Sequence, residues 1–206
     1  MGSNNPYRRA AGLYDRGLSL PGIARIRREE AEVVCAALAR CSADCGSALE
    51  VGPGTGFYTR LLARTIPRVT AVEDSTQMTD LLRHKLAADD VRNVDVVNAD
   101  FRTLAVEERF DLVIAIGVLD YIPEPQPFVD RMCALATKAV VFTVPQRGLL
   151  GSCFAAGNCL RRIAVYRHPK PGLEAWAPGW RCAVTEVGLK TLVTKGLTLV
   201  AVLERI

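Results

Sequence analysis

The sequence predicts an α/β fold whose sheet is doubly wound and mostly parallel, with helices on both of its faces. Apolar runs of strand length alternate with segments of helical periodicity, and a glycine cluster directly follows the first of these runs. In addition, the run at 110–116 (FDLVIAI) is apolar on both pleat faces after its opening pair. Strands that lie between two layers of helices have this composition, and alternation of strands with helices gives parallel βα units.

The order of elements follows from the same periodicities. Apolar residues recur at helical spacing from Gly22 to Arg40, so the first regular element is an amphipathic helix. Short apolar runs bounded by turn-forming residues predict strands at 48–51, 69–73, 94–98, 110–116, 139–144 and 197–203. Helical spacing predicts further helices at 57–65, 78–88, 128–136 and 184–194. The stretch from Pro145 to Arg181 lacks clear periodicity, and long loops of this kind are usually functional or mobile.

Length and composition limit the class of protein. With 206 residues, half of them apolar, the chain fits one domain with a substantial core. Its net charge of +4 falls short of the basic stripe of a nucleic-acid-binding protein, so no nucleic-acid partner is expected. The seven cysteines show no C-x-x-C spacing, which favours reduced thiols over a zinc site. Because the polar N-terminus lacks the apolar segment of a secretory signal and no run is long enough to cross a bilayer, we expect a cytoplasmic protein.

A glycine loop joins the first strand to the following helix in the sequence ALEVGPGTGFYTRLLA. Gly52, Gly54 and Gly56 lack a Cβ, which lets the backbone approach a nucleotide-type ligand closely. A dinucleotide fingerprint would place a glycine where Phe57 stands, and neither the spacing nor the Lys-Ser/Thr pair of a phosphate-binding P-loop is present. Nicotinamide-dependent oxidation and phosphoryl transfer are therefore disfavoured. Glu73 ends the next strand, roughly 20 residues downstream, where a carboxylate can accept both hydroxyls of a ribose.

Four segments in this order resemble the successive motifs of class I S-adenosylmethionine-dependent methyltransferases of the small-molecule type: EVGPGTG, AVEDSTQM, NADF and FDLVIAIGVLDYI. The resemblance covers residues 48–145 and implies a Rossmann-like fold. It implies transfer of a methyl group from S-adenosylmethionine to a small-molecule acceptor, with S-adenosylhomocysteine as the product. On this basis the chain is a single domain that comprises an N-terminal helical segment (1–46), a cofactor-binding core (47–145) and a substrate-side loop with the last helix and strand (146–206).

The resemblance also implies which residues bind the cofactor. The methionine end of the cofactor would lie along Glu50, Val51, Gly52, Pro53, Gly54 and Gly56. The ribose and adenine would be held by Glu73, Asp74, Ser75, Met78, Asp100 and Phe101, with Glu73 on the ribose and the ring of Phe101 over the adenine. Room beside the reacting methyl would come from Ile116 and Gly117, and the N-terminal Tyr14 would close over the cofactor.

Methyl transfer from a sulfonium depends on in-line positioning in a dry site more than on an acid or a base. Asp120 and Tyr121 are the nearest polar side chains after the fourth strand, so they are the candidate catalytic residues. A capping or turn role for Asp120 is an equally good interpretation. No cluster of acids and histidines marks a divalent-metal site, so no metal is expected.

The chain departs from the family pattern near its end. In the family the sheet finishes with a sixth strand and an antiparallel seventh, whereas here the run at 197–203 is interpreted as the sixth strand and the last strand as missing. The bare edge would be covered by residues 145–181 or by a second subunit in a dimer. Aromatic side chains such as Tyr166 and Trp180 either shape the acceptor site or serve only packing. Basic residues of the same stretch leave open a peripheral contact with a membrane.

Three alternative functions remain after the sequence has been considered. A domain of this fold can bind an adenosyl ligand without catalysis, because fold alone does not establish a reaction. A nucleic-acid methyltransferase and a nicotinamide-dependent oxidoreductase are weaker alternatives. The sequence does not distinguish O-, N- and C-methylation, and it does not identify the acceptor.

Overall fold

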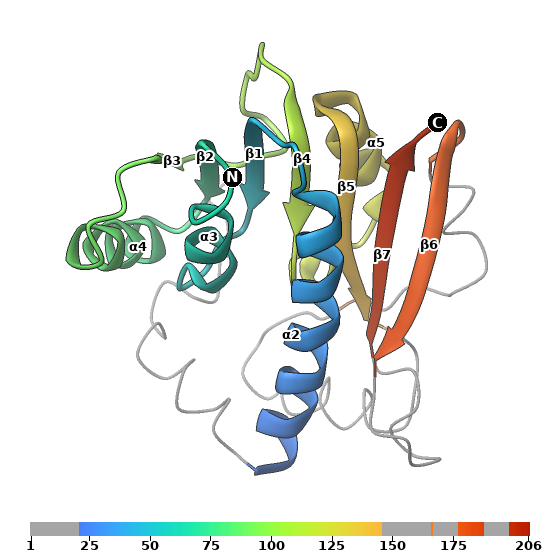
Figure 1. Ribbon diagram of the computed structural model, residues 1–206, viewed down its shortest axis with the longest axis horizontal. Coiled ribbons are helices and arrows are strands. Elements are labelled where there is room, and N and C mark those ends of the chain that lie inside the picture. The colour runs from blue at the N-terminus through green and yellow to red at the C-terminus, as the bar shows by residue number, and fades with distance from the viewer. Residues whose placement is uncertain (1–20, 146–165, 167–176, 188–197) are drawn as a thin grey trace.

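The computed structural model describes residues 21–145, 166, 177–187 and 198–206. Within these residues seven strands form one sheet, in the order β3-β2-β1-β4-β5-β7-β6 (Figure 1). The strands are β1 (Ser47–Val51), β2 (Arg68–Glu73), β3 (Val94–Asn98), β4 (Phe110–Ala115), β5 (Ala136–Pro145), β6 (Trp180–Val187) and β7 (Thr198–Arg205). The described helices are α2 (Pro21–Cys41), α3 (Phe57–Leu62), α4 (Thr76–Ala88), the 3-10 turn η2 (Leu119–Tyr121) and α5 (Pro125–Leu135).

The direction of the chain across the sheet reverses at β1. This strand pairs in parallel with β2 on one side and with β4 on the other, so the first half of the sheet grows one way and the second half the other way. In open α/β sheets, ligands bind beyond the C-terminal ends of the strands at such a switch point. The topology therefore predicts a ligand site at the C-terminal ends of β1, β2 and β4. The predicted doubly wound, mostly parallel sheet is confirmed.

The prediction for the C-terminal part of the chain is wrong in two respects. A helix was expected at 184–194, but residues 184–187 belong to strand β6. The sheet does not lack its last strand, because β7 is inserted antiparallel between β5 and β6 and pairs with both. From Trp180 to Val184, half-buried and exposed side chains alternate, which is the period of a strand with one solvated face. Since β7 is an interior strand, the bare edge that suggested a dimer does not exist there.

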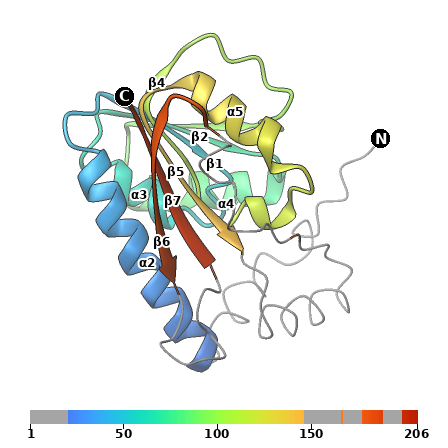
Figure 2. The ribbon, with the colours of Figure 1, turned by 90° about the vertical axis from the view of Figure 1, so that its right-hand side faces the viewer.

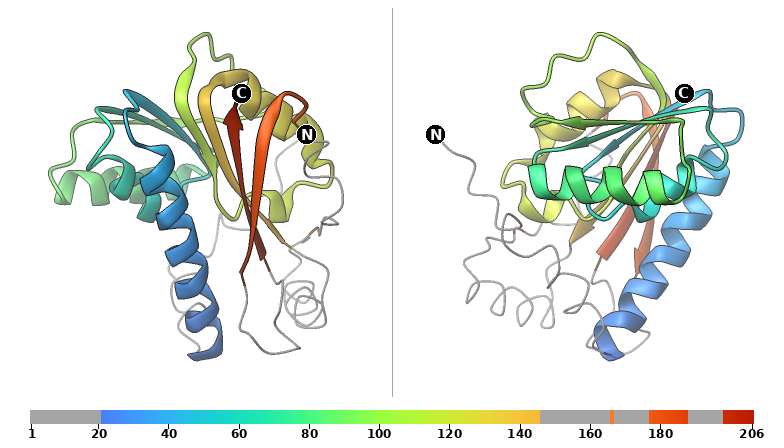
Figure 3. Two further views of the ribbon diagram at one scale, coloured as in Figure 1. Left: turned by 45° about the vertical axis from the view of Figure 1, so that its right-hand side comes forward. Right: turned by 90° about the vertical axis from the view of Figure 1, so that its left-hand side faces the viewer.

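Helices cover both faces of the sheet. Helices α2, α3 and α4 pack on one face and α5 packs on the other, as the side views show (Figure 2, Figure 3). Alternation along β1 follows this division, because Ala48 belongs to the core on the α2 side and Leu49 to the core on the α5 side. Among the described residues, no helix is both long and apolar enough to span a lipid bilayer.

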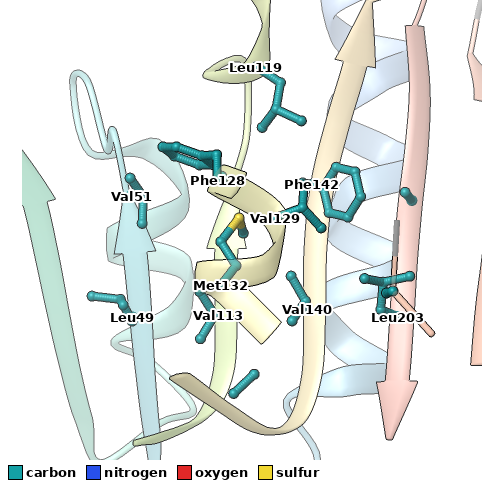
Figure 4. Packing of buried hydrophobic residues seen from close by; sticks show 14 of the residues in the cluster. Leu49, Val51, Val113, Leu119, Phe128, Val129, Met132, Val140, Phe142 and Leu203 are labelled. Carbon is teal, nitrogen blue, oxygen red and sulfur yellow. The ribbon is translucent and has the colours of Figure 1, made fainter. Parts of the chain in front are cut away.

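The core on the α5 side holds the loops after β3 and β4 in place. Phe128, Val129 and Met132 follow one another at helical spacing and lie against Val113 of β4 and Val140 of β5 (Figure 4). All five are buried, and each such side chain contributes about 1.5–3 kcal/mol by leaving water. A buried apolar layer between α5 and the sheet therefore supports the strands at the switch point.

Candidate functional site

The turn between β1 and α3 contains glycines with left-handed backbone conformations. Gly52 has φ of 66° and Gly54 has φ of 55°, which residues with a Cβ rarely adopt. A Cβ on Gly52 would lie 2.6 Å from Cγ2 of Val118, so this position excludes larger residues. At Gly54, by contrast, such a Cβ would lie 3.9 Å from Cε of Met78, the nearest heavy atom among the described residues beyond its chain neighbours. The backbone at Gly54 is accessible to a ligand.

The carboxylate of Glu73 faces this turn from the end of β2. Its Oε2 accepts a hydrogen bond from the amide of Gly54 at 3.4 Å, and its Oε1 accepts one from the amide of Ser75 at 2.9 Å. The side chain is buried, and this burial raises the pKa of Glu73, while the two amide hydrogen bonds oppose the rise and the neighbouring Asp74 adds to it. Glu73 thus joins the glycine turn to the start of α4.

Glu50 is a second buried carboxylate and lies on β1, next to the glycine turn. It is 2% exposed, and the hydroxyl of Thr59 donates a hydrogen bond to its Oε2 at 2.5 Å. Burial raises the pKa of Glu50 to about 7, the hydrogen bond from Thr59 opposes that rise, and the negative charge of Glu73 adds to it. Two acids with raised pKa values near the ends of the neighbouring strands β1 and β2 are characteristic of functional sites.

Ser75 and Met78, expected beside the adenine, lie at the start of α4. Ser75 is the N-cap of this helix and its hydroxyl accepts a hydrogen bond from the amide of Met78 at 3.4 Å. Both side chains are buried. The Ser75 hydroxyl therefore satisfies a helix end, which is a structural role, whereas the thioether of Met78 borders the approach to Gly54.

The loop after β3 departs from the expected arrangement. The ring of Phe101 is 4% exposed and packs edge to face on Phe128, with ring centroids 5.0 Å apart, and the guanidinium of Arg131 lies 5.0 Å from its centroid. The Phe101 ring is thus a core side chain. Asp100 is held by Arg102, whose Nη2 lies 2.6 Å from its Oδ2 and whose Nε lies 2.9 Å from its Oδ1.

Arg102 was not identified from the sequence. Its hydrogen bonds hold the pKa of the Asp100 carboxyl below its usual value, so Asp100 is a carboxylate at neutral pH. The only sequence signal was a basic residue two positions after an acid, and such pairs are common on protein surfaces.

The segment after β4 leaves the sheet at Gly117. The amide of Gly117 donates a hydrogen bond to the buried hydroxyl of Thr143 on β5, at 2.7 Å, in place of a backbone carbonyl. Among the described residues, and apart from the two chain neighbours of Gly117, no heavy atom lies within 4 Å of the position that a Cβ there would occupy. Ile116, one residue earlier, is partly buried against the core on the α2 side. Thr143 is therefore a second residue that sequence reasoning missed.

The candidate catalytic residues Asp120 and Tyr121 lie in η2, directly beyond this point, and both are partly buried. The carbonyl of Asp120 accepts a hydrogen bond from the amide of Tyr166 at 2.7 Å, which brings a distant part of the chain to the turn. Tyr14 and most of the stretch at 145–181 lie outside the described residues. Within the residues that the structure describes, no group of three or more His, Cys, Asp or Glu side chains is arranged to hold a metal ion.

Comparison with known proteins identifies relatives. Residues 48–138 match the family model of the methyltransferase domain. A malonyl-[acyl-carrier protein] O-methyltransferase of Priestia megaterium is 28% identical over 127 residues, which are 61% of this chain and 43% of that protein. Nodulation protein S of Bradyrhizobium diazoefficiens is 32% identical over 113 residues, which are 55% of this chain and 51% of that protein. The chain spans about half the length of these curated relatives.

Solved structures extend the likeness to nearly the whole chain. Magnesium protoporphyrin IX methyltransferase from Synechocystis PCC 6803 with bound S-adenosylhomocysteine is similar with a TM-score of 0.76, at 18% identity, over 97% of this chain and 96% of that chain. At this identity the likeness shows the fold. Residues 48–138 are therefore similar to the methyltransferase domain, and the chain as a whole shares its fold with this solved methyltransferase.

Proposed function

We propose that this chain binds S-adenosylmethionine at the C-terminal ends of β1 to β4 and transfers its methyl group to a small-molecule acceptor. The observation that carries the proposal is the pairing of a buried carboxylate with an accessible backbone turn: Glu73 Oε2 lies 3.4 Å from the amide nitrogen of Gly54. An adenosyl ligand needs an acceptor for its ribose hydroxyls next to a place where backbone and ligand approach closely. The two features meet at neighbouring strand ends.

The residues around this point fit the parts of the cofactor. Glu73 would accept the ribose hydroxyls with Asp74 beside it, and Asp100 would accept the adenine amino group, because a carboxylate has lone pairs left after pairing with one arginine. The turn from Val51 through Pro53 and Gly54 would follow the methionine part. Gly117, where no other described residue beyond its chain neighbours fills the place of a side chain, would lie beside the reacting methyl.

When bound, the cofactor would supply a methyl group on a positively charged sulfur for in-line transfer to the acceptor, with S-adenosylhomocysteine as the leaving group that keeps the bonding electron pair. The turn after β4 would position the acceptor beside that methyl group. Asp120 or Tyr121 would orient the acceptor or take its proton, since these side chains lie at the turn that follows Gly117. Tyr14 stays a prediction for closing the site.

Nicotinamide chemistry is disfavoured by the position of Phe57. In a dinucleotide site the third glycine of the fingerprint permits close packing at the helix start, and here that position carries an aromatic ring that is 53% exposed at the first residue of α3. A ring at this place would crowd a pyrophosphate. The sulfonium cofactor has no pyrophosphate and tolerates the side chain.

We keep the proposed division of one domain into residues 1–46, 47–145 and 146–206. The continuation of the sheet through β7 and β6 supports it, because these strands extend the same sheet as the cofactor half. Four expectations stay predictions: a cytoplasmic location, a peripheral membrane contact, a dimer and the absence of a nucleic-acid substrate.

Isothermal titration calorimetry on the full chain tests the proposal, with S-adenosylmethionine, S-adenosylhomocysteine and NAD⁺ as separate probes. We expect binding of the two adenosyl ligands and none of NAD⁺. Glu73→Gln should weaken S-adenosylhomocysteine by about 10- to 100-fold, which corresponds to one or two charge-assisted hydrogen bonds. Glu108→Gln is the matched control, because Glu108 pairs with Arg68 on the surface and not with the glycine turn. Binding of NAD⁺ alone, or of no probe, would refute the proposal.

A further inference from the structure

The loop after β3 contains a cation whose contacts join the two strand ends at which the adenine is expected. The guanidinium of Arg102 donates two hydrogen bonds to the carboxylate of Asp100, from Nη2 to Oδ2 at 2.6 Å and from Nε to Oδ1 at 2.9 Å. The backbone amide of Arg102 donates to the same carboxylate at 2.9 Å. Arg102 also interacts electrostatically with Asp74, which follows β2. The guanidinium is therefore fixed near the ends of both β2 and β3, which are paired neighbours.

The neighbouring aromatic residue is not free to take the same place. The ring of Phe101 is 4% exposed and is in contact with Phe128 and the guanidinium of Arg131, so it is enclosed by protein groups. Turning this ring toward a ligand would remove it from the core that α5 completes. The side chain of Arg102, in contrast, is 56% exposed.

A guanidinium held by a carboxylate is well suited to stack on a base. It is planar and weakly hydrated, and it stacks on aromatic faces while its edge keeps its hydrogen bonds. Here the edge is engaged with Asp100, while more than half of the Arg102 side chain is exposed among the described residues. Because the side chain is already held in place, ordering it on binding costs little conformational entropy.

We propose that Arg102 is an adenine-binding residue, which stacks its guanidinium on the base and holds Asp100 in position for the adenine amino group. The proposal rests on the proposed function, because it takes the adenosyl ligand as given. In this arrangement Arg102 fills the role that sequence motifs suggested for Phe101, and Phe101 supports the loop from the core. The adenosine part of the ligand alone should then depend on Arg102 as strongly as the whole ligand does.

Calorimetry with two probes, S-adenosylhomocysteine and adenosine, tests this on the full chain. Arg102→Gln removes the cation and should weaken both probes by a similar factor, about tenfold for one lost stacking contact with a base. Arg102→Lys keeps the charge without the planar fork and should fall between the wild type and the glutamine variant. A purely structural role would lower the unfolding midpoint of the ligand-free protein, so thermal unfolding of each variant is measured alongside.

The chain offers a matched control at the other end of β3. Arg92 pairs with Asp90 through the same two-residue spacing, with Nε to Oδ1 at 2.9 Å, and it lies before the strand instead of after it. Arg92→Gln should leave both affinities unchanged. Unchanged or tighter binding by Arg102→Gln would overturn the inference, and so would a loss confined to S-adenosylhomocysteine. If the wild-type protein binds neither probe, the proposed function fails first and the inference with it.

Discussion

The two halves of the sheet differ in how strictly their key positions require a particular residue type. In the half made by β3, β2, β1 and β4, the loops contain positions that admit few residues, such as Gly52 with its left-handed backbone and Glu73 with its two amide partners. In the half made by β5, β7 and β6, the described contacts are mostly between apolar side chains that other apolar residues could replace. Positions with a backbone or charge requirement therefore admit few residue types, whereas packing positions accept several apolar ones.

The largest expected effect comes from replacing a glycine by alanine, and the same substitution is compared in the two halves of the sheet. Gly52→Ala adds a Cβ that would meet Val118 in a left-handed conformation, so we expect a loss of about 2–4 kcal/mol in the free energy of unfolding and no measurable binding of S-adenosylhomocysteine. Gly179, in the turn before β6, has φ of 83°, but among the described residues no atom beyond its chain neighbours lies within 4 Å of the place of a Cβ. Gly179→Ala should therefore cost about 1–2 kcal/mol and leave binding intact. Urea unfolding and calorimetry measure both. Equal losses in the two variants would contradict the contrast.

A second prediction concerns the pH dependence of stability. The pKa of Glu50 is about 7 in the folded protein, against an ordinary value near 4.5 in the unfolded chain. Between these pH values the folded state keeps a proton that the unfolded state has released, so this contribution to stability is full below pH 4.5 and is lost as the pH rises through 7. Glu50 should account for up to about 3 kcal/mol of that loss.

Urea unfolding at pH 5 and pH 8 checks this prediction. The wild-type protein should lose more stability between the two pH values than Glu50→Gln, which cannot release a proton. Glu108→Gln is again the control, since its exposed ion pair with Arg68 should leave the pH dependence as it is in the wild type. The same pH dependence in the wild type and in Glu50→Gln would show that Glu50 is not the responsible group.

The smallest expected effect lies at the boundary between the halves. Thr143→Val keeps the shape of the side chain but removes the hydroxyl that accepts the Gly117 amide, so the free energy of unfolding should fall by about 1–3 kcal/mol. Thr143→Ser restores the acceptor and should recover most of that loss, apart from one methyl group. If the serine variant is as unstable as the valine variant, the hydrogen bond does not hold the segment after β4.

Much of the fold was predictable from the sequence, and the exceptions have physical causes. The strands β1 to β5 and the glycine turn were located within a few residues, because buried parallel strands are continuous apolar runs with glycine-rich or polar ends. Strand β6 was interpreted as part of a helix, since valines and leucines after Val184 also satisfy helical spacing. Its half-buried alternation depends on pairing with β7, which is a tertiary contact that local periodicity does not reveal.

The site was predictable where a residue type is dictated by backbone or charge, as for Gly54 and Glu73. The site was not predictable where a side chain could lie either in the core or toward the ligand. Phe101 turns into the core because Phe128 and Arg131 offer it contacts there, and Arg102 then occupies the outer side. Likewise, nothing in the residues around Thr143 indicated that its hydroxyl would accept a hydrogen bond from the amide of Gly117, which follows the neighbouring strand β4.

A crystal structure of the full chain with S-adenosylhomocysteine tests the central claim most directly. We expect the ribose at the end of β2, with both hydroxyls within about 2.5–3.0 Å of the carboxylate oxygens of Glu73, and the ligand in contact with the backbone at Gly54. A ligand bound at another edge of the sheet, or a ribose that leaves Glu73 without contact, would contradict the assignment of this site.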